Sequence, residues 1–222
     1  MKSSFTVTCS CDETFPLNAI GTQVPKDAQC PKCHSAIWLV EPLGNVVGMT
    51  ILGRAATELK NGDWTLAIVL GAMAIECELV YLFMKWKRID LMSARMPTDT
   101  DEEEWEKQWR DDVRTIAAPL DKVSRLLTGQ AFDSFLSQHT KTIQSRYPAY
   151  KGVASPKDFF VRELFHRRNK IVHFGEIDFQ QADAEMCFTL ATSLSQILAS
   201  MDAQARQVLD TKHKAAQTQG RS

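Results

Sequence analysis

The sequence has almost no excess of charge of either sign. Its 26 Lys and Arg residues are balanced by 27 Asp and Glu residues, which leaves a net charge of −1 on 222 residues. Such a chain has no overall field that would draw a polyanion to it. Binding of a nucleic acid would therefore depend on a local basic patch or on a small flexible substrate. The charge balance and the lack of a helix-turn-helix pattern argue against a DNA-binding regulator.

The sequence also has little that is typical of exported or membrane proteins. Residues 1–10 contain one lysine and no apolar block, so we expect no secretory signal and a cytoplasmic location. Only the stretch from Trp64 to Met84 is long and apolar enough to suggest a membrane span. Glu76 and Glu78 lie in its middle, and each acid there costs about 2.5–3.5 kcal/mol on insertion. We therefore expect no membrane span but the buried central helix of a soluble bundle.

Cysteine is scarce outside one N-terminal cluster. Cys77 and Cys187 stand alone in apolar stretches, where we expect buried side chains. The other four are Cys9, Cys11, Cys30 and Cys33. In a reducing compartment, clustered thiols indicate a metal site rather than disulfides. Four thiolates complete a tetrahedral zinc site and leave no position for a catalytic water, so the predicted zinc is structural.

The segment 5–42 resembles a zinc ribbon with a Cys-x-Cys-Gly opening and a Cys-Pro-x-Cys closing. Asp12 replaces the usual glycine of the opening, and His34 stands where a second glycine is common. His34 is an alternative ligand, but four thiolates already satisfy the metal, so we expect a turn residue there. Extended runs at 5–8 and 36–40 are the expected strands of the ribbon.

From residue 44 onward the apolar residues recur at helical spacing, which predicts an all-α bundle over 44–205. Good start and stop signals mark its helices: Asn61-Gly62 ends one, Asp63 caps the next, and Ser155-Pro156 begins another. The last predicted helix runs from about Phe179 through Ala205. Residues 206–222 are polar without periodicity, so we expect a disordered tail. The predicted fold is mainly α, with an N-terminal β zinc ribbon followed by a helical bundle.

The segment from Arg168 to His173 carries the most specific chemistry. It places a permanent cation, the amide of Asn169 and a group that titrates near neutrality within one and a half helical turns. These groups suffice for metal-free cleavage of RNA. The histidine would move a proton at the ribose 2′-hydroxyl or at the leaving oxygen, and the guanidinium would neutralise charge on the phosphate.

The spacing of these residues restricts how they meet. Five residues along an ideal helix correspond to about 140° around its axis, so Arg168 and His173 do not share a face, whereas Asn169 and His173 do. Two arrangements would bring them together. Either the helix ends or distorts near Val172, or the same segments of two subunits meet across a two-fold axis. The second arrangement builds one cleft from two arginines and two histidines.

The pattern Arg-Asn-x₃-His, after an amphipathic helix in an all-helical domain of this size, resembles the HEPN superfamily (higher eukaryotes and prokaryotes nucleotide-binding). The likeness covers about 44–205, and the stretch 72–76, Ala-Met-Ala-Ile-Glu, is similar to the second helix of many members. The resemblance implies a metal-independent, homodimeric endoribonuclease that leaves a 2′,3′-cyclic phosphate. It implies catalytic roles for Arg168 and His173, with Asn169 as an orienting amide and Glu76 as a further site residue. It also implies RNA as substrate, a toxin or phage-defence role, and a possible antitoxin or defence-system partner protein.

Simpler roles for the same residues stay open at this point. Arg168 is a candidate ion-pair partner of Asp183 or Glu185 on the following helix. His173 is a candidate helix-end residue, because Phe174-Gly175 predicts a C-terminus there and a cation at that end is favoured by about 0.3–1 kcal/mol. The superfamily also includes inactive members. The alternative function is a non-catalytic module that dimerises or binds a nucleotide or protein, with the ribbon as a docking domain.

Overall fold

The computed structural model describes residues 2–8, 14–20, 29–34, 44–92, 95, 97–112, 117–137 and 155–219. Helices dominate the described chain, which confirms the prediction of a mainly α protein. Its elements are β1 (Lys2–Thr8), β2 (Thr14–Ile20), α1 (Gly44–Asn61), α2 (Trp64–Met92), α3 (Asp99–Asp112), α4 (Ala117–Thr128), α5 (Phe132–Ser137), α7 (Pro156–Phe160), the π-helical turn η2 (Val161–His166), α8 (Arg167–Phe174) and α9 (Gln181–Gln219).

The N-terminal strands form an antiparallel pair in which Lys2 lies opposite Ile20 and Thr8 opposite Thr14. β1 includes the first strand expected from the sequence. β2 lies in the insert between the two cysteine pairs, where we predicted no strand. The second expected strand, 36–40, lies outside the described residues.

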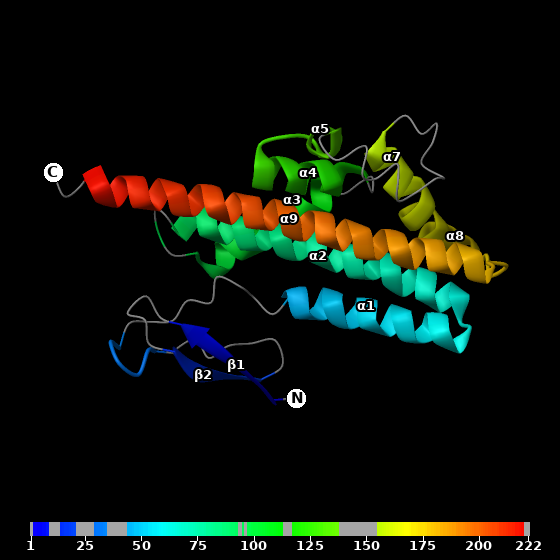
Figure 1. Cartoon of the computed structure of the whole chain (residues 1–222), viewed down its shortest axis with the longest axis horizontal. Coiled ribbons are helices and arrows are strands. Elements are labelled where there is room, and N and C mark those ends of the chain that lie inside the picture. The colour runs from blue at the N-terminus through cyan, green and yellow to red at the C-terminus, as the bar shows by residue number, and fades with distance from the viewer. Residues whose placement is uncertain are drawn as a thin grey trace.

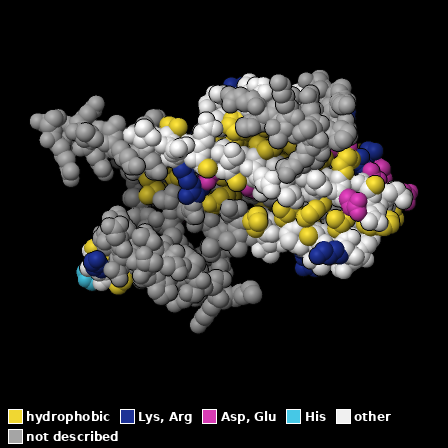
Figure 2. Space-filling model, viewed as in Figure 1, with side chains coloured by type: hydrophobic (Ala, Val, Ile, Leu, Met, Phe, Trp, Pro, Cys, Tyr) yellow, Lys and Arg dark blue, Asp and Glu magenta, His cyan; other side chains and the backbone are white. Residues whose placement is uncertain are grey.

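Helix α2 is the centre of the bundle. It packs along α9, with α1 beside it, while α4, α5 and α7 lie on another side (Figure 1). The side chain of Asp63 caps its first turn by accepting a hydrogen bond from the Leu66 amide at 3.0 Å, as predicted. The apolar residues Ile75 and Leu79 are buried against an equally buried row on α9. Figure 2 shows hydrophobic side chains in a strip along α2 between α1 and α9.

By length and composition, α2 is the one helix among the described residues that would be able to span a membrane. Within its most apolar window, however, 61% of the residues are buried inside the protein. The same test is passed by the core helix of a soluble bundle. The burial fits the expectation that this stretch forms the centre of a bundle.

A buried ionic cluster joins α2 to α9. Lys85, only 1% exposed, donates hydrogen bonds to both carboxylate oxygens of Asp202 at 2.9 and 2.8 Å. The indole Nε1 of Trp86 donates to the same carboxylate at 2.6 Å. Burial alone would raise the pKa of Asp202, but the hydrogen bonds from Lys85 and Trp86 outweigh it and the pKa is lowered. The carboxylate therefore stays charged and holds the two helices in one register.

Glu78 lies on the same buried side of α2 and gives the fold a predicted pH dependence. Burial is the largest cause that raises its pKa from 4.5 to about 7; nearby Asp202 raises it further and a hydrogen bond with Ser195 opposes the shift. Because the folded-state pKa is raised, the protonated carboxyl stabilises the fold below about pH 4.5, and this contribution is lost as the pH rises through 7. Relative to wild type, Glu78→Gln should gain about 2–3 kcal/mol of unfolding free energy between pH 5 and pH 8. Urea unfolding of both proteins at the two pH values measures this gain, and an equal difference at both would contradict the prediction.

The C-terminal helix differs from the sequence-based expectation. α9 continues to Gln219, whereas we expected the helix to end near Ala205 and a disordered tail to follow. Leu209 packs against the core one turn beyond Ala205. The residues that follow include Lys, Ala and Gln, which favour helix without needing an apolar stripe. Apolar periodicity detects the buried part of a helix and does not indicate an extension without an apolar stripe.

Candidate active site

Three consecutive elements carry the Arg168 segment. The side chain of Ser155 caps α7 by accepting a hydrogen bond from the Asp158 amide at 3.0 Å, as the sequence predicts. The backbone then passes through the π-helical turn η2 and continues as α8. α8 ends at Phe174, because Gly175 adopts a left-handed conformation with φ of 66° and closes the last turn. The predicted helix end at Phe174-Gly175 is confirmed.

Arg168 reaches across to α2. One of its terminal nitrogens contacts both carboxylate oxygens of Glu76, and the other donates to the side-chain oxygen of Asn169 at 2.7 Å. The Arg168 side chain is 21% exposed and that of Glu76 is 34% exposed. The structure thus brings together three of the four predicted site residues. Two acceptors fix the plane of the guanidinium and leave some of its five N–H groups for a ligand.

The simpler pairing considered for Arg168 is wrong. Asp183 pairs with the neighbouring Arg167, at 2.5 Å, and Glu185 accepts a hydrogen bond from Gln181 at 2.7 Å. Arg168 therefore faces α2 while Arg167 faces α9. The two side chains point to different helices because successive residues of a helix are rotated by 100°.

His173 lies apart from the Arg168–Glu76 pair. Its side chain is exposed in the last turn of α8, and within the part of the chain that the structure describes it has no hydrogen bond or ion pair. The segment from Arg167 to Phe174 is a regular α-helix, so Arg168 and His173 keep the separation of about 140°. The helix ends one residue after His173, too late to bend this side chain toward Arg168. Its position in the last turn fits the helix-end role.

Exposed apolar side chains occur on α8, directly after it and on α2. Beside His173, the side chains of Val172, Phe174 and Ile177 are 54%, 83% and 69% exposed. On α2, Met73 and Val80 are exposed on either side of Glu76, at the spacing that places them on its face. Clustered exposed apolar residues mark contact surfaces in soluble proteins. This set, Met73, Val80, Val172, Phe174 and Ile177, is called the apolar rim below.

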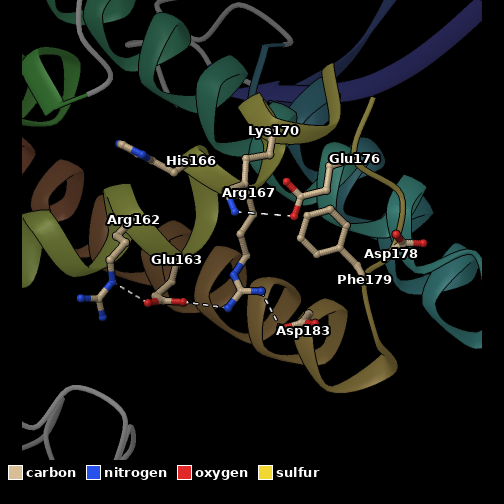
Figure 3. A pocket seen from close by; sticks show the side chains of 9 residues that line it. All are labelled: Arg162, Glu163, His166, Arg167, Lys170, Glu176, Asp178, Phe179 and Asp183. Carbon is tan, nitrogen blue, oxygen red and sulfur yellow. Dashed lines mark hydrogen bonds and ion pairs between the residues drawn. The ribbon is translucent and has the colours of Figure 1, made fainter. Parts of the chain in front are cut away.

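A cleft of about 400 Å³ lies between η2, α8 and the start of α9. Its cations are paired: Arg162 with Glu163 at 2.6 Å, Arg167 with Glu163 and Asp183, and Lys170 with Glu176 at 3.6 Å (Figure 3). Charged side chains of both signs also gather where α8 meets the start of α9 in Figure 2. The basic residues of this segment are therefore largely neutralised, and the cleft offers little spare positive charge to a phosphate.

Part of the predicted zinc site lies within the described residues. Residues 31–33 form a turn, the His34 amide donates to the Cys30 carbonyl at 2.9 Å, and His34 has φ of 56°. Glycine adopts such a left-handed conformation more readily than histidine does. Cys9 and Cys11 lie outside the described residues. Among the residues that are described, no group of three or more His, Cys, Asp or Glu side chains is placed to hold a metal ion.

The sequence did not indicate the π-helical turn or the bond from Arg167 to Asp183. Arg167 and Asp183 are an ordinary cation and an ordinary acid in charged surroundings, and no local signal marks them as partners. In comparisons with known proteins, no family model matches the chain, and neither does any curated protein or solved structure. The resemblance to the HEPN superfamily therefore rests on the Arg-Asn-x₃-His pattern, its helical setting and the stretch 72–76.

Proposed function

We propose that this chain is a metal-independent endoribonuclease of the HEPN type that acts on cytoplasmic RNA as a toxin or phage-defence effector. The observation that supports this most is the arrangement of Arg168. Its guanidinium is oriented by Glu76 and Asn169, remains partly accessible, and lies on the same short helix as an exposed histidine. A purely structural ion pair would not require an orienting amide, or an exposed imidazole on the same short helix.

The reaction needs only groups from the protein and the substrate. His173 accepts the proton of a ribose 2′-hydroxyl, whose oxygen attacks the neighbouring phosphorus in line. The bond from phosphorus to the 5′-oxygen breaks, and that oxygen takes up a proton from a second imidazole. The products are a 2′,3′-cyclic phosphate and a 5′-hydroxyl. Arg168 stabilises the negative charge that develops on the phosphate oxygens.

Two copies of the chain complete this site in the proposal. Within one protomer Arg168 and His173 remain about 140° apart on α8, so a single chain does not direct both at one phosphate. A two-fold axis near α8 would supply the second histidine from the partner. The residues of the apolar rim are exposed on the elements that carry Arg168, His173 and Glu76, and a symmetric contact would bury such side chains. We therefore propose a homodimer, with an antitoxin or defence-system protein as a further partner.

The N-terminal segment 5–42 is proposed to hold one structural zinc through Cys9, Cys11, Cys30 and Cys33. The turn that carries Cys30 and Cys33 supports this, because the left-handed His34 and the hydrogen bond to the Cys30 carbonyl place the two residues in one tight turn of the backbone. Bound zinc would stabilise the fold of the ribbon and supply no step of the reaction.

The zinc proposal predicts a defined stoichiometry. The purified protein should contain one zinc per chain, and the Cys30→Ser/Cys33→Ser double variant should contain almost none, because two of four ligands are lost. Inductively coupled plasma mass spectrometry measures both. Cys77→Ser/Cys187→Ser is the matched control and should keep its zinc. A metal-free wild type, or a double variant with unchanged zinc, would refute the site.

The proposed activity is tested by incubating the purified protein with single-stranded and structured RNA in the presence of a chelator. Cleavage that proceeds without divalent metal is expected. The paired cations of the cleft leave little positive charge for a phosphate and so favour a second candidate, a non-catalytic module that binds a protein. RNA that stays intact with the dimeric protein, under all conditions tried, would favour this second candidate.

A further inference from the structure

Arg167 connects the Arg168 segment to α9. Its guanidinium donates to Asp183 at 2.5 Å and to Glu163 at 3.0 Å, so one side chain bridges α9 and the preceding π-helical turn (Figure 3). The side chain is 23% exposed. Burial alone would raise the pKa of Glu163, but the hydrogen bonds from Arg167 and Arg162 outweigh it and lower the pKa. All members of the bridge are therefore charged at neutral pH.

A second contact lies one helical turn away. The thiol of Cys187 on α9 donates a hydrogen bond to the backbone carbonyl of Glu163 at 3.1 Å. Cys187 is fully buried, and burial raises its pKa to about 12, so the thiol stays protonated and remains a donor. Asp183 and Cys187 are four residues apart on α9, and Glu163 and Arg167 are four residues apart on the opposing segment. These four residues are called the Arg167 clamp.

The Arg167 clamp contacts the π-helical turn, which changes the rotation of the residues that follow it about the helix axis. In the π-helical turn from Val161 to His166 the backbone bonds reach one residue further than in an α-helix. One additional residue rotates everything that follows by about 100° relative to an uninterrupted α-helix. Without that rotation, Arg168 would point away from Glu76. π-Helical turns are rare and need support from their surroundings, which Glu163 receives through both its carbonyl and its carboxylate.

We propose that Arg167 is a positioning residue. Through Glu163 and Asp183 it fixes the rotation of α8 at which Arg168 meets Glu76 and His173 faces the solvent. The predicted effect of Arg167 on RNA cleavage rests on the proposed function. The predicted effect on the orientation of Arg168 and His173 does not.

The test compares Arg167→Met with Arg162→Met. In both variants methionine keeps the aliphatic part of the side chain and removes the guanidinium group. Arg162 also pairs with Glu163, but its side chain is 58% exposed and this ion pair stays within η2, so Arg162 is the matched control. Two readouts are needed: kcat and KM for RNA cleavage, and the nuclear magnetic resonance signals of the Arg168 Nε–H group and the His173 imidazole.

For Arg167→Met we expect kcat to fall by about 10- to 100-fold, because a small misplacement of catalytic groups costs rate rather than binding. KM should stay within about three-fold of wild type, since Arg168 and His173 are both still present. The Arg168 and His173 signals should shift. Arg162→Met should leave the rate and both signals unchanged. Asp183→Asn keeps an acceptor without its charge and should give an intermediate effect in the same direction.

The proposal is overturned if Arg167→Met has the kcat and the side-chain signals of wild type. It is also overturned if Arg162→Met has the same effect as Arg167→Met. If Arg167→Met does not fold, Asp183→Asn decides, and unshifted Arg168 and His173 signals in that variant overturn the proposal. If the wild-type protein does not cleave RNA, the proposed function fails, and the two resonances alone decide whether the clamp sets α8.

Discussion

Replacing Arg168 or His173 with alanine is expected to reduce RNA cleavage by about 10²–10⁴-fold while the protein remains folded. General acid–base catalysis by a positioned side chain contributes a factor of this size, and so does one group that stabilises charge in the transition state. Both side chains lie at least partly in solvent, so neither truncation opens a hole in the core. Single-turnover rates on a labelled RNA, measured in chelator, give the two factors.

Two replacements of Glu76, the ion-pair partner of Arg168, test whether the negative charge or the hydrogen-bond acceptor of Glu76 is needed. Glu76→Gln retains an oxygen that accepts from Arg168 and should lose about ten-fold or less, whereas Glu76→Ala removes that contact and should lose more. Phe188→Leu, a conservative change at a partly buried core position, is a control that should leave the rate unchanged. If Arg168→Ala or His173→Ala loses helicity, unfolding explains the slower rate and the variant gives no support for a catalytic role. Rates equal to wild type would contradict it.

Replacing Asp202 with alanine is expected to lower the unfolding free energy by about 3–5 kcal/mol, because it leaves the ammonium of Lys85 buried without its counter-charge. The indole N–H of Trp86 loses its acceptor at the same time. Urea unfolding at pH 7 measures the loss. Arg206→Ala is the control: Arg206 also pairs with Asp202, at 3.1 Å, but is 47% exposed, so it should cost no more than about 0.5 kcal/mol.

A double replacement tests the reason for this loss. Lys85→Met/Asp202→Leu removes both charges and fills the same space with apolar atoms, so it should recover most of the stability that Asp202→Ala loses. If Asp202→Ala costs less than about 1 kcal/mol, Lys85 is solvated in solution and the cluster does not hold α2 on α9.

Local signals explain the parts of the fold that were predictable. The caps at Asp63 and Ser155 and the helix end at Gly175 depend on residues within one turn, so the sequence is enough to place them. β2 was missed because Pro16 interrupts an alternating run and is unfavourable inside most strands. In a two-stranded pair every strand is an edge, where proline is tolerated.

The candidate site was only partly predictable, because its contacts join distant residues. Charge and proximity alone favour an ion pair of Arg168 with Asp183 or Glu185 on the following helix, and that pairing is wrong. Its actual partner, Glu76, is 92 residues away and was suggested only by the resemblance. The π-helical turn sets which of the two adjacent arginines, Arg167 or Arg168, faces α2, and no sequence pattern predicts such a turn.

The local charge around η2 and α8 was not predictable by counting charged residues. Counting cations along η2 and α8 predicts attraction of phosphate, but the count omits the carboxylates that the fold brings to the same cleft from α9 and from the turn before it. Ion pairing is a property of the folded chain, so the field near α8 was not available from the sequence alone.

The chemistry of the RNA ends tests metal-free cleavage by Arg168 and His173 most directly. RNA is incubated with the wild-type protein in excess chelator, and the new ends are identified by mass spectrometry. We predict 2′,3′-cyclic phosphate and 5′-hydroxyl ends from the wild type and neither from Arg168→Ala or His173→Ala. Fragments with 5′-phosphate ends, cleavage that stops in chelator, or the same fragments from all three proteins would contradict this mechanism.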